Sequence, residues 1–564
     1  MTDVRIRFKL LSRVLPALLV LTSFAASIAK ADDAQTKIIA SVTVADNDSL
    51  WNAAEKIAAE MKYDAAVRSA KSVFSANNKL FAALDPAKQK GIVVFTNGTD
   101  IVPFAYLPVT PDSLDEAAIN ELKEQLNDKT DGKFDELFLK DSTVYVCNSK
   151  FKDAVTSLDE GYKTAAAQEG KTTLVAVDVA LGNIPDQFIE AGLANVRQKI
   201  AESLSDADAE ATETVASLLD FYSTLIDSIE NVKFAVCVDS EANVTVNASV
   251  KSVSGSELED IINGSANLTT RWTSFAETNN LALFSVKAQK QIKALNDIRA
   301  KQIHNAMHEN LLNSLDVQLD SPEDLDVAKQ VVQIIEDEAL ASLELDVVDC
   351  GFALGIDPFI IKTAGSVAKP DDVKKGLQLV AERIKKDVED FDKYASINAE
   401  EKEGFSVTKV NVPISDISDD APDFLAGKSL SARIGIDSES FVFFFGLDGE
   451  TLDAEFAKTL AGSKEKKPVP AESFLDLVPI AKGAYQILSQ MDDVNPPALD
   501  SVEAAANAGT IKFVCKEECK DGAVDVDFVI DHNFFKTAGE ILRINVTGGS
   551  TEDNSEDVDD LFEE

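Results

Sequence analysis

The chain has 564 residues and carries 97 acidic residues against 54 basic ones, a formal net charge of −43 at pH 7. A surface this acidic repels nucleic acid and anionic lipid at ordinary salt, so we expect neither as a partner, whereas cations and basic proteins remain candidates. Hydrophobic residues make up 45% of the chain, enough to build cores, which excludes an intrinsically disordered acidic chain. The length predicts two to four domains.

The first 31 residues predict a secretory signal peptide. Basic residues up to Arg13 precede an apolar run from Val14 to Ala26, and Ala29-Lys30-Ala31 forms an A-x-A cleavage pattern. This order is typical of signal peptides, and the apolar run is shorter than a membrane-spanning helix. We therefore expect cleavage after Ala31, an exported protein in the periplasm or the medium, and no membrane association after cleavage. An uncleaved anchor is the alternative.

Beyond this leader, the spacing of apolar residues predicts that residues 36–90 are mostly helical. Residues 91–110 predict a β-hairpin around the turn dipeptide Asn97-Gly98, because this pair accepts the backbone angles of a tight turn. A helix is expected at 111–126. A strand is predicted at 173–179, followed by long helical patterns.

A strand–turn–strand–helix pattern then recurs along the chain. We place its four copies at 232–262, 345–386, 430–460 and 510–542. The strands that open longer blocks, at 174–177 and 281–286, also resemble each other. The period is uneven, which indicates duplicated domains rather than a short-period solenoid. Hairpins followed by helices predict the α+β class, with antiparallel sheets and helices packed on one face.

The predicted organisation has four parts. They are the signal peptide at 1–31, a first α+β domain at 32–265, a second, related α+β region at 266–547, and an acidic disordered tail at 548–564. A Lys- and Pro-rich run marks a candidate sub-boundary near residue 465.

Three segments resemble uncharacterised exported α/β repeat proteins of planctomycete-type bacteria. They are the hairpin at 91–110, with Phe104-Ala105-Tyr106-Leu107-Pro108-Val109-Thr110, the strand at 174–179, and residues 250–262 with Ser254-Gly255-Ser256. The likeness covers much of residues 90–265, and its motifs are structural. That family has no assigned activity, so the resemblance implies export and a repeated α/β layout only.

The sequence contains no recognised catalytic or nucleotide-binding motif. It lacks the G-x-S-x-G nucleophile elbow, the P-loop pattern and the G-x-G-x-x-G turn. Three histidines in 564 residues also make the common His-based reactions unexpected. We therefore predict no catalytic residue and no cofactor, and an enzyme is the less favoured class.

His304 and His308 are the weak candidates for a metal site. They are four residues apart and share one face of a predicted helix. In the H-E-x-x-H zinc motif a glutamate follows the first histidine, whereas Asn305 stands there in this chain. Glu309 offers a third ligand only in awkward geometry. An exposed polar helix face is the alternative, and no metal is assigned.

The five cysteines are too few, and odd in number, for a disulfide scaffold. Cys147, Cys237 and Cys350 lie in apolar runs and are predicted to be small buried side chains. Cys515 and Cys519 flank a charged tripeptide at a predicted hairpin turn, so a disulfide between them is a candidate that the sequence leaves open.

These features predict an exported, soluble, acidic protein with a binding or structural role and an unidentified partner. One alternative is an exported hydrolase whose carboxylate site is not visible as a motif. Another is a carrier that holds an apolar ligand between sheet and helices. A cleft with converging buried carboxylates of raised pKa favours the hydrolase, a large dry cavity favours the carrier, and a flat acidic surface favours the first class.

Overall fold

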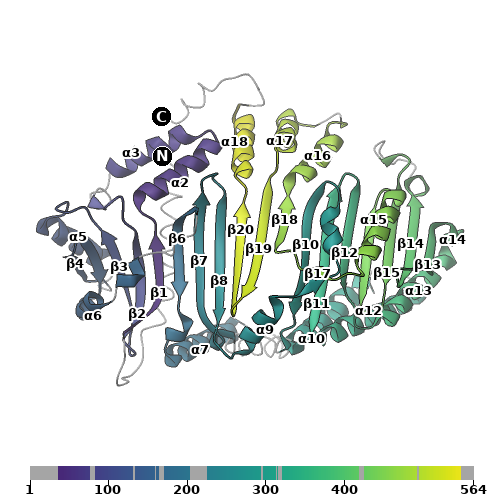
Figure 1. Cartoon of the computed structure of the whole chain (residues 1–564), viewed down its shortest axis with the longest axis horizontal. Helices are drawn as coiled ribbons and strands as arrows, with labels where there is room; N and C mark the ends of the chain where they lie inside the picture. Colours follow the sequence, from purple (N-terminus) through teal and green to yellow (C-terminus); the bar gives the residue numbers. More distant parts are fainter. Residues whose placement is uncertain are drawn as a thin grey trace. The chain divides into compact units, whose positions relative to one another are not determined.

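A computed structural model of the chain (Figure 1) describes residues 36–547, apart from 77–82, 131–133, 159, 164–169, 204–224, 294–295, 313, 316–320, 418–424 and 492–493. The predicted signal peptide and acidic tail lie outside the described residues. Contacts divide the chain into two compact units. Unit 1 comprises residues up to Leu258 together with Ala523–Gly539, and unit 2 comprises Glu259–Gly522 together with Glu540–Thr551.

The described part of unit 1 is built on nine antiparallel strands. Their spatial order is β4-β5-β3-β2-β1-β6-β7-β8-β20. Residues of β3 alternate strictly between half-buried and buried, the period expected of a strand with two unequal faces. The strands are β1 (Lys37–Val44), β2 (Lys90–Thr96), β3 (Ile101–Pro108), β4 (Glu136–Lys140), β5 (Thr143–Cys147), β6 (Lys171–Val179), β7 (Ile229–Asp239), β8 (Val244–Ser252) and β20 (Ala523–Ile530).

The described part of unit 2 also has a nine-stranded antiparallel sheet. Its order is β19-β18-β10-β11-β12-β16-β15-β14-β13, and a short pair, β9 (Thr269–Thr270) with β17 (Lys467–Pro468), stands apart from it. The strands of the sheet are β10 (Leu281–Lys290), β11 (Val347–Ile356), β12 (Phe359–Ser366), β13 (Ala395–Lys402), β14 (Phe405–Pro413), β15 (Ser429–Ile436), β16 (Ser440–Gly446), β18 (Glu472–Asp476) and β19 (Lys512–Lys520).

Helices connect these strands, and several begin at a side chain that accepts hydrogen bonds from the first turn. Asp46, Ser321, Asp448 and Asp476 cap helices in this way. The helices are α2 (Asn47–Glu60), α3 (Asp64–Ala76), α5 (Glu116–Thr130), α6 (Lys152–Ser157), α7 (Asp186–Ser203), α9 (Glu257–Ser265), α10 (Asn296–Asn305), α12 (Pro322–Ser342), α13 (Pro370–Asp387), α14 (Phe391–Tyr394), α15 (Gly449–Gly462), α16 (Leu477–Leu488), α17 (Pro496–Ala506) and α18 (His532–Thr547), with a π-helical turn at Ala306–Leu312.

The predicted repeat is part of a larger module that occurs four times along the described chain. Each module runs strand, one or more helices, strand, strand, helix. The modules are β1-α2-α3-β2-β3-α5, β6-α7-β7-β8-α9, β10-α10-α12-β11-β12-α13 and β18-α16-α17-β19-β20-α18. In each, the first strand pairs antiparallel with the second. Three of the predicted hairpin–helix copies are the ends of such modules, whereas the copy at 430–460 is the separate unit β15-β16-α15.

The core of unit 2 lies between one face of its sheet and α15. Phe444 of β16 stacks edge-on against Phe456 of α15 at 5.3 Å between ring centroids, and Trp272 and Phe275 complete this cluster. The other sheet face meets α16, because a Cβ on Gly483 would lie 2.6 Å from Ile356 Cγ2. Helix α15 therefore covers the core side of the sheet, and α16 packs against the end of β11.

Unit 1 buries residues on both faces of its sheet. Tyr106 on β3 belongs to an aromatic cluster in which Tyr162 stands edge-on to Phe104 at 5.5 Å. The next residue of the strand, Leu107, packs on the opposite side with Ile119 of α5. Neighbouring residues of a strand point to opposite faces, so each face has its own cluster.

The α+β class and the antiparallel sheets are confirmed, and one local prediction is wrong. Residues 37–44 form β1, paired with β2 and β6, although a mostly helical segment was expected from residue 36. The β-branched residues of this segment suit a paired strand better than a helix. Among the described helices, none has the length and apolar character needed to cross a membrane.

Candidate functional site

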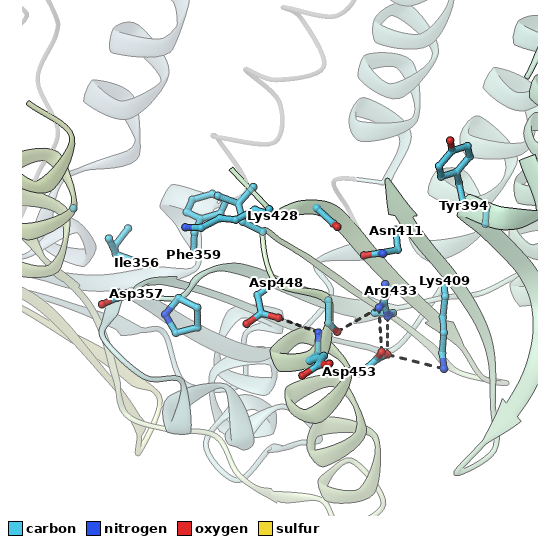
Figure 2. Close-up of a pocket in the computed structure, with 18 of the residues that line it drawn as sticks. Ile356, Asp357, Phe359, Tyr394, Lys409, Asn411, Lys428, Arg433, Asp448 and Asp453 are labelled. Atoms are coloured by element: carbon cyan, nitrogen blue, oxygen red, sulfur yellow. Dashed lines mark hydrogen bonds and ion pairs between the residues drawn. The ribbon is translucent and has the colours of Figure 1, made fainter. Parts of the chain in front are cut away.

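A cleft of about 1620 Å³ opens in unit 2 beside the ends of several strands. Figure 2 shows Ile356 and Phe359 toward one end of it, Arg433 and Lys409 toward the other, and Asp448 between them. The β11–β12 turn, the start of β15, the first turn of α15 and one face of α16 supply most of the lining. The cleft thus combines an apolar side with a polar side.

The apolar side is formed by α16 and the β11–β12 hairpin. Ile480 and Ile487 of α16 line the cleft and are 37% and 42% exposed. The helix approaches β11 closely because Gly483 has no side chain at the contact with Ile356. Exposed branched side chains grouped on one wall are a surface that a ligand can cover.

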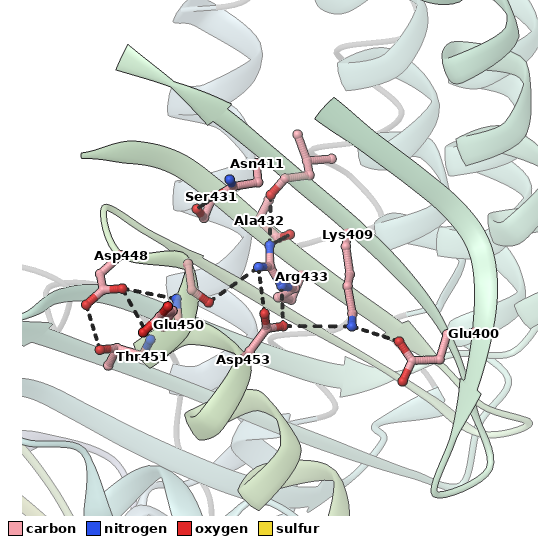
Figure 3. Close-up of polar contacts among 12 residues, drawn as sticks. Glu400, Lys409, Asn411, Ser431, Ala432, Arg433, Asp448, Glu450, Thr451 and Asp453 are labelled. Atoms are coloured by element: carbon pink, nitrogen blue, oxygen red, sulfur yellow. Dashed lines mark hydrogen bonds and ion pairs between the residues drawn. The ribbon is translucent and has the colours of Figure 1, made fainter. Parts of the chain in front are cut away.

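The polar side is organised by Arg433 on β15. Its guanidinium donates to both oxygens of Asp453 at 2.7 and 3.1 Å, and to the main-chain carbonyls of Val410 and Ala432, each at 2.8 Å. Figure 3 shows that Asp453 also forms an ion pair with Lys409. Arg433 is only 4% exposed, so these bonds fix its position. A two-point pair of this kind holds both partners in one geometry.

Two carboxylates that line the cleft, Asp448 and Asp453, are held in their ionised form. The hydrogen bonds from Arg433 hold the pKa of Asp453 below its ordinary value, although burial acts in the opposite direction. Asp448 caps α15, and its bonds to Thr451 lower its pKa likewise. A carboxyl group with a lowered pKa cannot hold the proton that a general acid must donate near neutral pH.

The structure brings His304 and His308 together with a third residue that the sequence did not indicate. His304 Nδ1 lies 2.8 Å from one oxygen of Glu336, and His308 Nε2 lies 2.7 Å from the other. Glu336 comes from α12 and is 4% exposed. These three ligand atoms lie within 4.8 Å of one another. The predicted pair therefore belongs to a cluster with Glu336, whereas the side chain of Glu309, the third ligand considered from the sequence, lies outside the described residues.

The structure does not bring the two cysteines of the disulfide candidate together. Cys515 and Cys519 both lie on β19, and they are not bonded to each other. Four residues of extended strand separate their Cα atoms by about 13 Å, about twice the reach of a disulfide. The hairpin turn is at Asp521-Gly522, where both residues have positive φ. Cys147 and Cys237 are buried as expected, whereas Cys350 is exposed.

No family model, curated protein or solved structure matches the chain. Fold and cleft therefore define its class by themselves. It is an α+β protein of repeated strand–helix–hairpin–helix modules, with an open amphipathic cleft beside the strand ends of unit 2.

Two residues that organise these sites escaped the sequence reasoning. Asp453 is one of 97 acidic residues, and only the fold shows that it meets Arg433. Glu336 left a weak signal in the sequence, because it follows the apolar Val332 by four residues and so shares its helix face. A charged residue on the buried face of a helix usually has a partner, and that rule would have flagged Glu336.

Proposed function

We propose that the protein is an exported binding protein and that the cleft of unit 2 holds its ligand, an extended amphipathic segment for which a peptide is the simplest probe. The carrying observation is the pairing of an apolar α16 wall with a polar side immobilised by Arg433 and Asp453. At about 1620 Å³ the cleft exceeds the 300–1,000 Å³ of ordinary small-molecule pockets. Three observations support export: the signal-peptide pattern of residues 1–31, the acidity of the chain and the resemblance to exported repeat proteins.

The cleft favours this function over the two alternatives. The mark of a carboxylate hydrolase is a cleft carboxyl group of raised pKa, whereas the pKa values of Asp448 and Asp453 are lowered. Burial raises the pKa of Asp349, but this residue is hydrogen-bonded to Thr270 and Arg271 and does not line the cleft. A carrier of a purely apolar ligand would leave the charged side uncovered.

Selection from a phage-displayed peptide library against the full mature chain tests the proposal. The native protein should be recovered from the periplasm or medium with Asp32 as its first residue. Selected peptides should bind the Ile487→Glu variant more than about tenfold more weakly, since the loss of one apolar anchor exceeds about 1.4 kcal/mol. Peptide affinity is measured by fluorescence anisotropy.

Ile384→Glu is the matched control. Ile384 lies on α13, outside the cleft, and is 43% exposed, close to the 42% of Ile487. The control should bind the selected peptides as the unchanged protein does. If no peptide is enriched, or if both variants bind equally well, the cleft is not the ligand site. A cytoplasmic protein that begins at Met1 would remove export from the proposal.

A further inference from the structure

The cluster of His304, His308 and Glu336 lies in unit 2 away from the cleft, and none of its members lines the cleft. His304 lies in the last turn of α10, and His308 lies in the π-helical turn that follows. The imidazole rings lie 4.4 Å apart between centroids. Widened helical turns of this kind occur frequently at functional sites.

The cluster has the composition and spacing of a metal site. Two imidazole nitrogens and a carboxylate are ligands that Zn²⁺ and neighbouring divalent metals accept. Ligands about 2.0–2.1 Å from a tetrahedral ion lie roughly 3.3 Å from one another. The three ligand atoms lie within 4.8 Å of one another. To admit an ion, the imidazole–carboxylate distances of 2.7 and 2.8 Å would open to about 3.3 Å as metal bonds replace the direct hydrogen bonds, and a small rotation of the partly exposed imidazoles is enough for this.

The burial of the cluster is graded from base to rim. The side chain of Glu336 is 5% exposed, those of His308 and His304 are 37% and 58% exposed, and Gln333 donates to Glu336 at 3.4 Å. A carboxylate fixed at the base, with a neighbouring amide bonded to it, is the support that metal ligands usually have. The exposed imidazoles leave the solvent side open, where a water molecule can complete the coordination.

We propose that His304, His308 and Glu336 form a binding site for one divalent transition-metal ion of the zinc type, with three protein ligands and one position open to water. The acidic surface does not account for such a site, because exposed carboxylates prefer hard cations such as Ca²⁺ and keep them hydrated. Imidazole ligands give the cluster a preference for zinc, cobalt, nickel or copper that the surface lacks.

Titration of the chelator-treated full chain with Co²⁺ tests the site, because four-coordinate Co²⁺ absorbs visible light far more strongly than the hydrated ion. We expect one equivalent of strongly absorbing Co²⁺, displaced by an equivalent of Zn²⁺. His308→Ala and Glu336→Gln should weaken binding by more than the roughly 10–100-fold that loss of an outer-shell partner costs. His304→Ala should do the same. Because the His304 side chain is the most exposed of the three, this variant carries the smallest risk of unfolding.

His532→Ala is the control, because His532 lies in unit 1 beside Asn243 and Asp531. This variant should keep the full Co²⁺ spectrum, and circular dichroism should show all four variants folded. The proposal is overturned if only the weak spectrum of hydrated Co²⁺ is seen, which would mean adventitious binding to surface carboxylates. It is also overturned if His304→Ala and His308→Ala leave the strong spectrum unchanged.

Discussion

Lys362 on β12 is a charged side chain in the middle of an aromatic core. It is 0% exposed, its ammonium group lies 2.8 Å from Glu455 of α15 and 5.1 Å from the centre of the Phe444 ring. Burial lowers the pKa of the ammonium group, and the pair with Glu455 offsets only part of this effect. An ion pair of this kind costs more in lost hydration than an apolar residue of the same size.

Replacing Glu455 and replacing Lys362 should therefore change the stability of unit 2 differently. Glu455→Gln should destabilise unit 2 by about 2–3 kcal/mol, somewhat less than for a fully buried pair, since Glu455 is 20% exposed. Lys362→Met should be neutral or stabilising. Urea unfolding followed by the fluorescence of Trp272 measures both, in a Trp51→Phe background that silences the second tryptophan. Equal destabilisation by both variants would contradict the argument.

The same pair predicts a pH dependence with a definite sign. The folded state holds the Lys362 proton less tightly than the unfolded state, so the cost of burying the charge is complete below the lowered folded pKa. As pH rises from there toward 10.5, the ordinary value, the folded state loses its proton first and the cost is relieved. The stability advantage of Lys362→Met should therefore shrink over this range, and an advantage that grows would refute the sign.

Comparing predicted and observed secondary-structure elements shows which of them local sequence patterns predict. The hairpin around Asn97-Gly98 was predictable because the turn dipeptide and the flanking alternation agree. The β19–β20 turn was misplaced by a few residues, although Asp521-Gly522 carries the same signal, because the cysteine pair suggested a turn nearby. The helical pattern predicted for residues 36–90 fails over β1, whose residues pair with β2 and β6. Local signals therefore located most hairpins and failed where two of them competed.

The candidate sites depend on packing between elements, which local patterns do not contain. His304 and His308 could be paired from their spacing, but Glu336 joins them only because α12 packs beside the helix that carries them. Arg433 and Asp453 are 20 residues apart and meet because α15 folds back over β15. Residues that share one helix face were predictable, and partners from a second element were not.

The close approach of α18 to the end of α2 gives a prediction for one element. A Cβ on Gly539 would lie 2.4 Å from the main-chain oxygen of Met61, and a backbone atom cannot move aside as a flexible side chain can. Gly539→Ala should destabilise the docking of α18 by about 1–3 kcal/mol, the cost of overpacking. Hydrogen exchange measured by mass spectrometry over residues 532–547 should show faster exchange.

Gly192→Ala is the matched control, because Gly192 also lies in a helix of unit 1 and nothing approaches its Cβ position within 4 Å. The same chemical change should stabilise α7 by roughly 0.5–1 kcal/mol through higher helix propensity. If both substitutions stabilise their helices, the contact at Gly539 is looser than the structure shows.

At the scale of the whole molecule, the recurring module explains how such a long chain builds its sheets. Each copy adds three strands and the helices between them, and the first strands of the first two copies, β1 and β6, pair with each other. The same relation holds between β10 and β18 in unit 2. When the first strands of two modules pair, neither strand is left as an exposed edge of the sheet.

The net charge sets the response of the whole chain to salt. Even if every basic residue paired with one acidic residue, 97 − 54 = 43 carboxylates would have no counterpart. Their mutual repulsion opposes the compact state, and salt screens it over about 10 Å at 0.1 M. Salt also weakens exposed ion pairs such as Lys385–Asp392, which lowers the stability of the folded state. Each such pair contributes only about 0–1 kcal/mol.

Raising NaCl from 10 mM to 500 mM should therefore raise the melting temperature of the chain by several degrees, since about 1 kcal/mol shifts a domain of 150–250 residues by roughly 2–4 °C. Differential scanning calorimetry measures the change. MgCl₂ at equal ionic strength is the comparison. An equal rise means screening alone, and a larger rise adds binding of the divalent ion to folded carboxylates. A melting temperature that falls with NaCl would mean that the pairs outweigh the repulsion.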